Sequence, residues 1–207
     1  MFTDRKNSPF GAASYPQHDY SLYDRNGRRK YLNAAERERF IAVANKRDGA
    51  IRTLCLTLLY SGCRLSEALN VQPDHILTEE SILLIRSLKK RGVLVIRQMP
   101  MSSEFMALLE THVQSLQSSG NIDQHRLWPW GRTWAWMQVK EVMAEANIVG
   151  PQACPRGLRH GFAVHAVQSG VPLNMVQRWL GHANIRTTAI YTNVVGPEER
   201  AIAQRMW

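Results

Sequence analysis

The side chains in this sequence that could act on a phosphate group gather in three stretches of the chain. In the first, Arg64 follows Ser61-Gly62-Cys63. Glycine allows one helix to end and the next to begin there, with the Arg64 guanidinium pointing to the side. The second stretch reads as a hairpin and contains no acidic residue. Its basic residues are Arg86, Lys89, Lys90, Arg91 and Arg97.

The third stretch begins at Arg159-His160, continues with Leu180-Gly181-His182 and ends at Tyr191. Arginine carries a rigid fork of donors that matches two phosphate oxygens, so a pair of arginines could hold a phosphodiester from two sides. A tyrosine beside them could act as a nucleophile. No cluster of Asp and Glu accompanies these cations, which argues against a two-metal nuclease and for catalysis by fixed positive charge.

The elements that must position these residues are mostly helices. Asn33 and Glu36 form the pattern of a capping box at the start of one helix. Two runs rich in Ile, Leu and Val, Ser81–Arg86 and Gly92–Met99, flank the basic stretch Ser87–Arg91 and predict a β-hairpin. The fold class is therefore mainly α with a small antiparallel β-sheet. The other expected helices cover Ile51–Tyr60, the residues after Cys63, Ser103–Leu116, Thr133–Ala146 and three shorter segments within Pro155–Asn193, one with Pro172 at its first position and Gly181 after its end.

Length and composition limit the classes of protein to consider. A chain of 207 residues suffices for one ordinary domain plus a tail. Its net charge of +9 makes a polyanion the expected partner, nucleic acid ahead of an acidic membrane surface. The sequence has neither a long apolar run nor a signal peptide, so we expect a cytoplasmic, nucleoid-associated protein with no membrane partner.

Cysteines and tryptophans are expected to have structural roles. Cys55, Cys63 and Cys154 are odd in number and widely spaced, which predicts reduced, buried thiols and no disulfide or zinc site. A tryptophan-rich segment of a small domain is more often core than a base-stacking surface. We therefore expect packing roles for Trp128, Trp130, Trp134 and Trp136.

From about Asn33 to the end, the chain resembles the tyrosine recombinases, or phage integrases, in four ordered motifs. These are Ser61-Gly62-Cys63-Arg64-Leu65-Ser66-Glu67, Pro155-Arg156-Gly157-Leu158-Arg159-His160, Leu180-Gly181-His182 and Thr187-Thr188-Ala189-Ile190-Tyr191. The resemblance implies the helical catalytic domain of that family, over residues 34–207. It also implies cleavage and rejoining of double-stranded DNA through a 3′-phosphotyrosine, without metal, nucleotide or other cofactor.

The matched positions imply a role for each catalytic residue. Arg64 and Arg159 would hold the phosphate, His182 would be a further phosphate ligand, and Tyr191 would be the nucleophile. Lys89 would protonate the leaving 5′ oxygen, with Lys90 as the alternative.

Two residues of the second motif leave the proton acceptor open. The position that is usually histidine is Arg156 here. As a catalytic residue, its guanidinium could still stabilise the phosphate, but it cannot act as a base because its pKa is above about 12. His160 is as compatible with orienting its neighbour as with a catalytic role.

Residues 1–33 form the second departure from the family pattern. Most members carry a helical DNA-binding domain before the catalytic one, and we expect that domain to be absent here, replaced by a flexible basic arm. Several copies of the chain on one DNA, and an accessory DNA-binding protein, are the other expected partners. The residues expected to contact DNA are Arg28, Arg29 and Lys30 in the arm and Lys90 and Arg91 in the hairpin.

Two other functions remain open at this point. A relaxing activity like that of type IB topoisomerases would use the same nucleophile on one duplex without a partner. A non-catalytic DNA-binding regulator could have kept the scaffold alone. The full set of catalytic residues argues against the regulator, whereas the expected loss of a domain argues for it.

Overall fold

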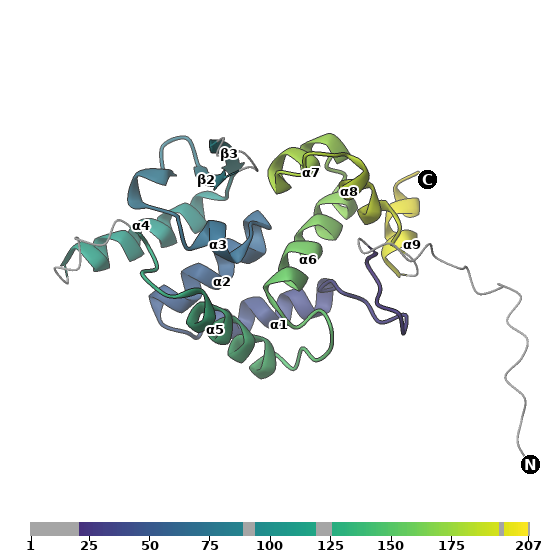
Figure 1. The fold of residues 1–207 in the computed structure, drawn as a ribbon, viewed down its shortest axis with the longest axis horizontal. Coiled ribbons are helices and arrows are strands. Elements are labelled where there is room, and N and C mark those ends of the chain that lie inside the picture. The colour runs from purple at the N-terminus through teal and green to yellow at the C-terminus, as the bar shows by residue number, and fades with distance from the viewer. Residues whose placement is uncertain (1–20, 89–93, 119–125, 195–196, 207) are drawn as a thin grey trace, which may run out of the picture.

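The computed structural model describes residues 21–88, 94–118, 126–194 and 197–206 of the chain. It is mainly helical with one small antiparallel sheet, which confirms the predicted fold class (Figure 1). The helices are α1 (Ala34–Ala44), α2 (Gly49–Ser61), α3 (Leu65–Ala68), α4 (Ser103–Ser118), α5 (Arg132–Glu145), α6 (Pro155–Gln168), α7 (Leu173–Leu180), α8 (Arg186–Ala189) and α9 (Pro197–Ala203), with 3-10 turns η1 (Pro73–His75), η3 (Ile190–Thr192) and η4 (Gln204–Met206).

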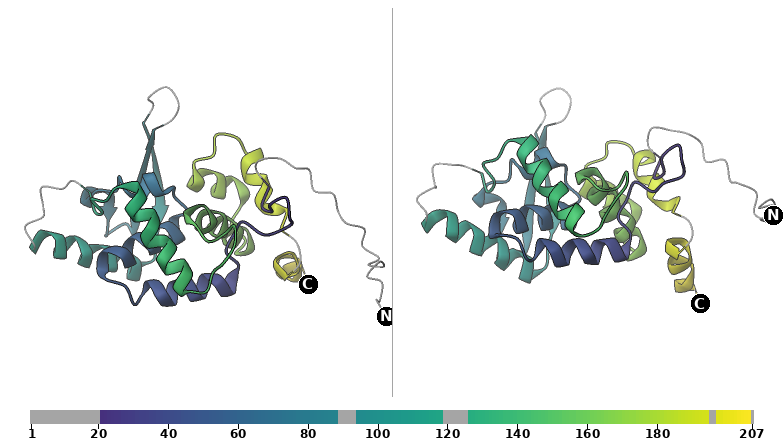
Figure 2. Two further views of the ribbon diagram at one scale, coloured as in Figure 1. Left: turned by 60° about the horizontal axis from the view of Figure 1, so that its bottom comes forward. Right: turned by 90° about the horizontal axis from the view of Figure 1, so that it is seen from below.

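The sheet contains the predicted hairpin and one additional short strand. Its order is β1 (Ile76–Leu77), β2 (Ile82–Leu88) and β3 (Leu94–Pro100), with antiparallel pairing throughout. The hairpin register pairs Ile85 with Arg97 and extends to Leu88 opposite Leu94. In Figure 2 both strands point away from the helical body, and their connection, residues 89–93, lies outside the described residues.

Local sequence signals explain where several helices begin. Asn33 and Glu36 make the predicted capping box: the Asn33 side chain accepts from the Glu36 amide, and the Glu36 carboxylate accepts from the Asn33 amide. Pro155 occupies the first turn of α6, where its missing N–H is harmless. Pro172, predicted at the first position of a helix, is instead the N-cap of α7, one residue earlier.

Two hydrophobic clusters share α6. The larger lies among α1 to α5 and the sheet and includes Leu158 near the start of α6. The smaller contains Ala163 and Val164 from the middle of α6 together with residues of α7 and of the segment around Tyr191. In Figures 1 and 2, α6 stands between the sheet-bearing part of the molecule and α7 to α9. Helix α6 therefore joins the two parts.

Part of the segment expected as an arm is packed against the smaller cluster. Leu22 and Tyr31 are buried there, and Arg28 forms an ion pair of 2.8 Å with Asp24. Arg29 donates to both carboxylate oxygens of Glu36 at 2.6 and 3.0 Å, and Lys30 donates to the Ser21 carbonyl. Residues 1–20 of the expected arm lie outside the described residues.

The expectation for the tryptophans is half right. Trp128 is fully buried and donates to Thr53, and Trp130 packs against the core. The prediction is wrong for Trp134 and Trp136, which are 42% and 44% exposed on α5. Their positions precede and follow the buried Ala135, so the helical period turns them outward.

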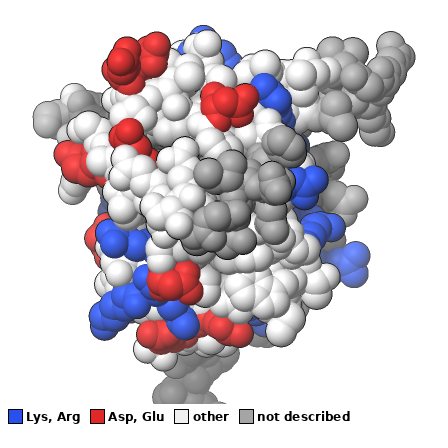
Figure 3. All heavy atoms as spheres, turned by 90° about the vertical axis from the view of Figure 1, so that its left-hand side faces the viewer, with Lys and Arg blue, Asp and Glu red and all other residues white. Residues whose placement is uncertain are grey.

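The cysteines are free thiols: Cys55 and Cys63 are buried, as predicted, and Cys154 is half-buried. Acidic and basic side chains are interspersed on the side of the molecule that lies to the left in Figure 1 (Figure 3). Among the described residues, no helix has the length and apolar character needed to cross a membrane.

Candidate active site

Arg64 is placed by the end of one helix and the start of the next. Helix α2 ends at Ser61, and Gly62 takes a left-handed conformation with φ of 60°. A Cβ atom at Gly62 would lie 2.4 Å from the ring of Phe162, so only glycine fits this turn. Arg64 then serves as N-cap of α3, and its side chain is 50% exposed.

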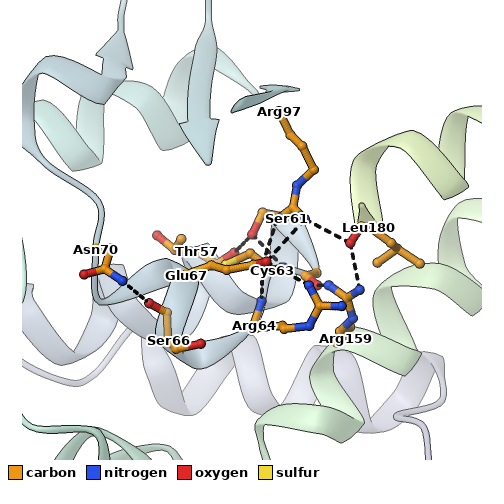
Figure 4. A network of polar contacts seen from close by, with 11 residues as sticks. Thr57, Ser61, Cys63, Arg64, Ser66, Glu67, Asn70, Arg97, Arg159 and Leu180 are labelled. Carbon is orange, nitrogen blue, oxygen red and sulfur yellow. Dashed lines mark hydrogen bonds and ion pairs between the residues drawn. The ribbon is translucent and has the colours of Figure 1, made fainter. Parts of the chain in front are cut away.

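A buried carboxylate, that of Glu67, holds Arg64 in place. Glu67 accepts from the Arg64 amide at 2.8 Å and from Nη1 of Arg64 at 2.8 Å, which forms an ion pair between residues three apart. Arg97 approaches the same carboxylate from β3, with Nη2 at 2.7 Å (Figure 4). Burial alone would raise the pKa of Glu67, but the hydrogen bonds and charge of Arg97 outweigh it and lower that pKa. Glu67 is therefore ionised and holds both guanidinium groups.

Arg159 is fastened to the backbone where two helices end. Its Nη1 donates to the Gly62 carbonyl at 2.7 Å, and its Nη2 donates to the Leu180 carbonyl at 2.7 Å (Figure 4). Helix C-termini leave carbonyls without intrahelical partners, and a cation is favourable there. Arg97 also donates to the Leu180 carbonyl, at 3.0 Å. Arg159 thereby joins the ends of α2 and α7, while a guanidinium retains further N–H donors for another acceptor.

The charge of this cluster is positive, because three guanidinium groups surround one carboxylate. Burial and the charge of Arg64 lower the pKa of Arg159 to about 10, so it is still protonated at neutral pH. Beside the cluster lies a hollow of about 710 Å³, lined in part by Arg64, Arg86 and Arg126. An anion entering this hollow would reduce the mutual repulsion of the arginines, so the site favours a negatively charged group.

Tyr191 lies in η3 and is 1% exposed. Its Oη is 3.0 Å from Nδ1 of His160, and its ring stacks on His182 at a centroid distance of 6.3 Å. Nδ1 of His182 is in turn 2.9 Å from the hydroxyl of Thr188. The structure thus brings Tyr191 together with a histidine from α6 and a histidine that follows α7.

The surroundings keep the tyrosine protonated and both histidines neutral. Burial raises the pKa of Tyr191 to about 12, against the opposing charges of Arg159 and Arg64. Burial, with the charges of Arg159 and Arg64, lowers the pKa of His182 to about 3. Burial also lowers the pKa of His160 to about 4, with contributions from Arg159, Arg156 and Lys30. Because Arg159 and Arg64 act on both Tyr191 and His182, these four side chains form one site.

Other residues singled out in the sequence lie apart from this cluster or beyond the described residues. Arg156 is exposed on α6, and its charge is close enough to act on His160. Lys89, Lys90 and Arg91 lie outside the described residues. In the part of the chain that is described, no group of three or more His, Cys, Asp or Glu side chains could hold a metal ion.

The supporting role of Arg97 was not predicted from the sequence. It counted as one of several basic residues in a hairpin, yet the structure leaves only 3% of its side chain exposed. Alternation along β3 offered a signal, because Met99 and Arg97 share one face and Met99 is buried. At Gly181, with φ of 68°, a Cβ atom would lie 2.2 Å from Nη1 of Arg97, so this glycine leaves room for the contact.

Replacing Arg97 with methionine is expected to lower the free energy of unfolding by about 3 kcal/mol, because Glu67 would keep only the half-exposed Arg64 as its cationic partner. Urea denaturation measures the change. Arg86→Met is the matched control, because Arg86 is 39% exposed on the neighbouring strand and lies 4.0 Å from Asp74. It should change stability by less than about 0.5 kcal/mol. Equal losses in the two variants would contradict a special role for the buried pair.

A helical domain with a small antiparallel sheet, in which arginines and a histidine gather beside a buried tyrosine, is the type of catalytic domain expected from the sequence. The model of the phage integrase family matches residues 30–196. The chain belongs to this family of tyrosine recombinases.

Among its relatives is the tyrosine recombinase XerA of Pyrococcus horikoshii, which is 33% identical over 172 residues. The aligned part is 80% of this chain and 57% of the relative. Tyrosine recombinase XerD of Brucella abortus is 31% identical over 161 residues, which are 72% of this chain and 49% of the relative. The chain therefore spans about half the length of these relatives.

Solved structures show the same fold. A crystal structure of XerA recombinase superposes with a TM-score of 0.75 at 26% identity, covering 85% of this chain and 64% of that one. A structure of XerH site-specific recombinase bound to its difH substrate gives a TM-score of 0.67 at 20% identity, covering 89% of this chain and 60% of that one. The latter likeness supports the fold alone.

Proposed function

We propose that this protein cleaves and rejoins strands of double-stranded DNA through a covalent 3′-phosphotyrosine at Tyr191. One observation carries the proposal: Arg159 and Arg64, held in one cluster by backbone carbonyls and by Glu67, lie close enough for their charges to act on Tyr191. A phosphodiester in the adjacent hollow would meet the guanidinium of Arg64, which lines it.

The two arginines differ in how they would serve. Arg159 is buried and held by two backbone carbonyls, so its remaining donors are fixed before DNA arrives. Arg64 is half-exposed and tied at one side to Glu67, so it can meet the phosphate from the solvent side. His182, neutral and anchored by Thr188, would donate a hydrogen bond to a phosphate oxygen. All three would stabilise the charge that develops as Tyr191 attacks.

The roles of the groups in the remaining steps are supported by the sequence motifs alone. Lys89, with Lys90 as the alternative, would give a proton to the 5′ oxygen that leaves. Arg156 would contact the phosphate from the exposed side of α6. Because one phosphodiester is exchanged for another, the reaction is close to isoenergetic and needs no nucleotide. Attack by the 5′-hydroxyl of another strand would complete recombination.

DNA binding would involve more of the chain than the catalytic cluster. XerH, a structural neighbour solved in complex with its difH substrate, suggests DNA as the partner of this chain too. Residues 34–207 would form the catalytic unit, while Lys90, Arg91 and the basic residues of 1–33 would contact the DNA backbone. Arg28, Arg29 and Lys30 have partners within the chain, so any contact with DNA would require sharing or exchanging them. Assembly of several copies, with or without an accessory DNA-binding protein, belongs to this proposal.

The proposal is tested with nicked DNA carrying candidate sites, in which the cleaved 5′ end diffuses away. We expect a protein–DNA adduct that survives denaturing electrophoresis, carries the label of the 3′ side and forms without metal or nucleotide. Binding without any adduct would favour the regulator. Relaxation of one supercoiled duplex without strand exchange between two sites would favour the topoisomerase-like activity.

A further inference from the structure

The Tyr191 hydroxyl has one hydrogen-bond partner among the described residues, and this partner is His160. The distance between Oη and Nδ1 is 3.0 Å. His160 directly follows Arg159 on α6, and the ring of Tyr191 lies 5.8 Å from its own at the centroids. The histidine is thus positioned by the same helix turn that positions a phosphate-binding arginine.

The other groups near Tyr191 are poorly suited to take its proton. Arg156 and Arg159 are guanidinium groups, which stay protonated in proteins. His182 stacks on the tyrosine ring, and its Nδ1 is committed to Thr188. His160, in contrast, is neutral, so one of its ring nitrogens is an acceptor, and Nδ1 is the nitrogen that faces the hydroxyl.

We propose that His160 is the general base of strand cleavage, accepting the Tyr191 proton at Nδ1 as Oη attacks the phosphate. This inference rests on the proposed function. It gives His160 a catalytic role because its Nδ1 contacts the reacting oxygen, and it assigns the proton that Arg156 cannot accept.

The Oη–H bond breaks and its proton moves to Nδ1 while the Oη–P bond forms. The P–O5′ bond breaks, and the 5′ oxygen takes a proton from a separate acid, for which Lys89 is the proposed donor. The result is a 3′-phosphotyrosine, a free 5′-hydroxyl and a protonated His160. In the rejoining step, His160 returns its proton to Oη as tyrosine leaves.

Bound DNA would make His160 a stronger base, because its phosphate offsets the positive charges around the histidine. Burial is the main cause of its low pKa of about 4, and the charges of Arg159, Arg156 and Lys30 add to it. The groups facing it are Arg156 and Arg159 on its own helix, Lys30 from the segment before α1, Tyr191 in η3 and His182 after α7. A bound phosphodiester brings a negative charge to this cationic cluster, which favours the protonated imidazole. Proton transfer would then be coupled to attack.

The test compares His160→Asn with the unaltered chain in single-turnover cleavage of the nicked DNA. Asparagine places Oδ1 near the position of Nδ1, so it keeps an acceptor for the Tyr191 hydroxyl and cannot take up a proton. We expect DNA binding to be unchanged and cleavage at pH 7 to fall by at least about 100-fold. The variant's rate should rise close to tenfold per pH unit above pH 7, as hydroxide replaces the base, more steeply than that of the unaltered chain.

A substrate with sulfur in place of the leaving 5′ oxygen separates the nucleophile from the leaving group. Because a thiolate leaves without a proton, this substrate should restore cleavage by Lys89→Ala and leave the deficit of His160→Asn unchanged. His165→Asn is the matched control, because His165 lies about one and a half turns further along the same helix, whereas the histidine that contacts the Tyr191 hydroxyl is His160. It should cleave at the rate of the unaltered chain.

Three results would overturn the role of His160. One is cleavage by His160→Asn within about threefold of the unaltered chain. Another is a slow variant whose pH dependence matches that of the unaltered chain, which would mean a structural role. The third is faster cleavage by His160→Leu, which would mean that the hydrogen bond holds Tyr191 back from DNA. If the unaltered chain itself forms no adduct, the proposed function fails instead.

Discussion

Tyr191→Phe is expected to abolish the covalent protein–DNA adduct while DNA binding stays close to that of the unaltered chain. The substitution removes only the attacking oxygen, and the ring can keep its place against His182. Losing the hydrogen bond to His160 should cost about 1 kcal/mol of stability, so the variant should fold. Denaturing electrophoresis of the nicked-DNA reaction measures the adduct, and a mobility-shift titration measures binding.

Two other tyrosines serve as matched controls for Tyr191. Tyr31 is buried in the same hydrophobic cluster, with its hydroxyl 3.4 Å from that of Tyr23. Tyr60 is half-buried and packs edge-on against Phe105. Tyr31→Phe and Tyr60→Phe should each form the adduct at the rate of the unaltered chain. An adduct formed by Tyr191→Phe and lost in one of these variants would assign the nucleophile to that other tyrosine.

The fold was predictable where local physics decides the structure. The capping box at Asn33 and the two β-rich runs around the basic turn are signals carried by neighbouring residues, and both elements are present. The strand Ile76–Leu77 was missed because two residues carry no alternation pattern. Its pairing with Leu83 and Ile82 comes from the hairpin already in place.

The residue types of the site could be predicted from the sequence, but the contacts between these residues could not. The motifs selected Arg64, Arg159, His182 and Tyr191 for consideration, but the sequence could not decide whether His160 faces Tyr191. That contact depends on how α6 packs against η3, which lies 31 positions along the chain. Likewise, the pairing of Arg97 with Glu67 spans 30 positions and is fixed by the hairpin register. Such long-range contacts follow from the tertiary structure, which no short pattern encodes.

Replacing either phosphate-binding arginine by lysine is expected to slow cleavage by about 10²–10³-fold, since one fixed donor to the developing charge typically contributes that much. Lysine keeps the charge but loses the planar fork, so it should rescue poorly. Single-turnover cleavage of the nicked DNA measures the rate for Arg64→Lys and Arg159→Lys.

The two arginines are expected to differ in what they do for stability. Arg159 bridges the carbonyls of Gly62 and Leu180, and a lysine ammonium cannot reach both in that geometry. Arg159→Lys should therefore also lower the free energy of unfolding by about 2 kcal/mol, the loss of one charge-assisted hydrogen bond to a buried carbonyl.

Arg64→Lys should leave stability nearly unchanged, because its side chain is half-exposed and Glu67 retains Arg97. This contrast separates catalysis from folding within one pair of substitutions. A loss of cleavage in Arg64→Lys without loss of stability can only come from the altered contact with DNA. Near-normal cleavage by Arg64→Lys would instead assign Arg64 to its ion pair with Glu67 and leave Arg159 as the main guanidinium ligand of the phosphate.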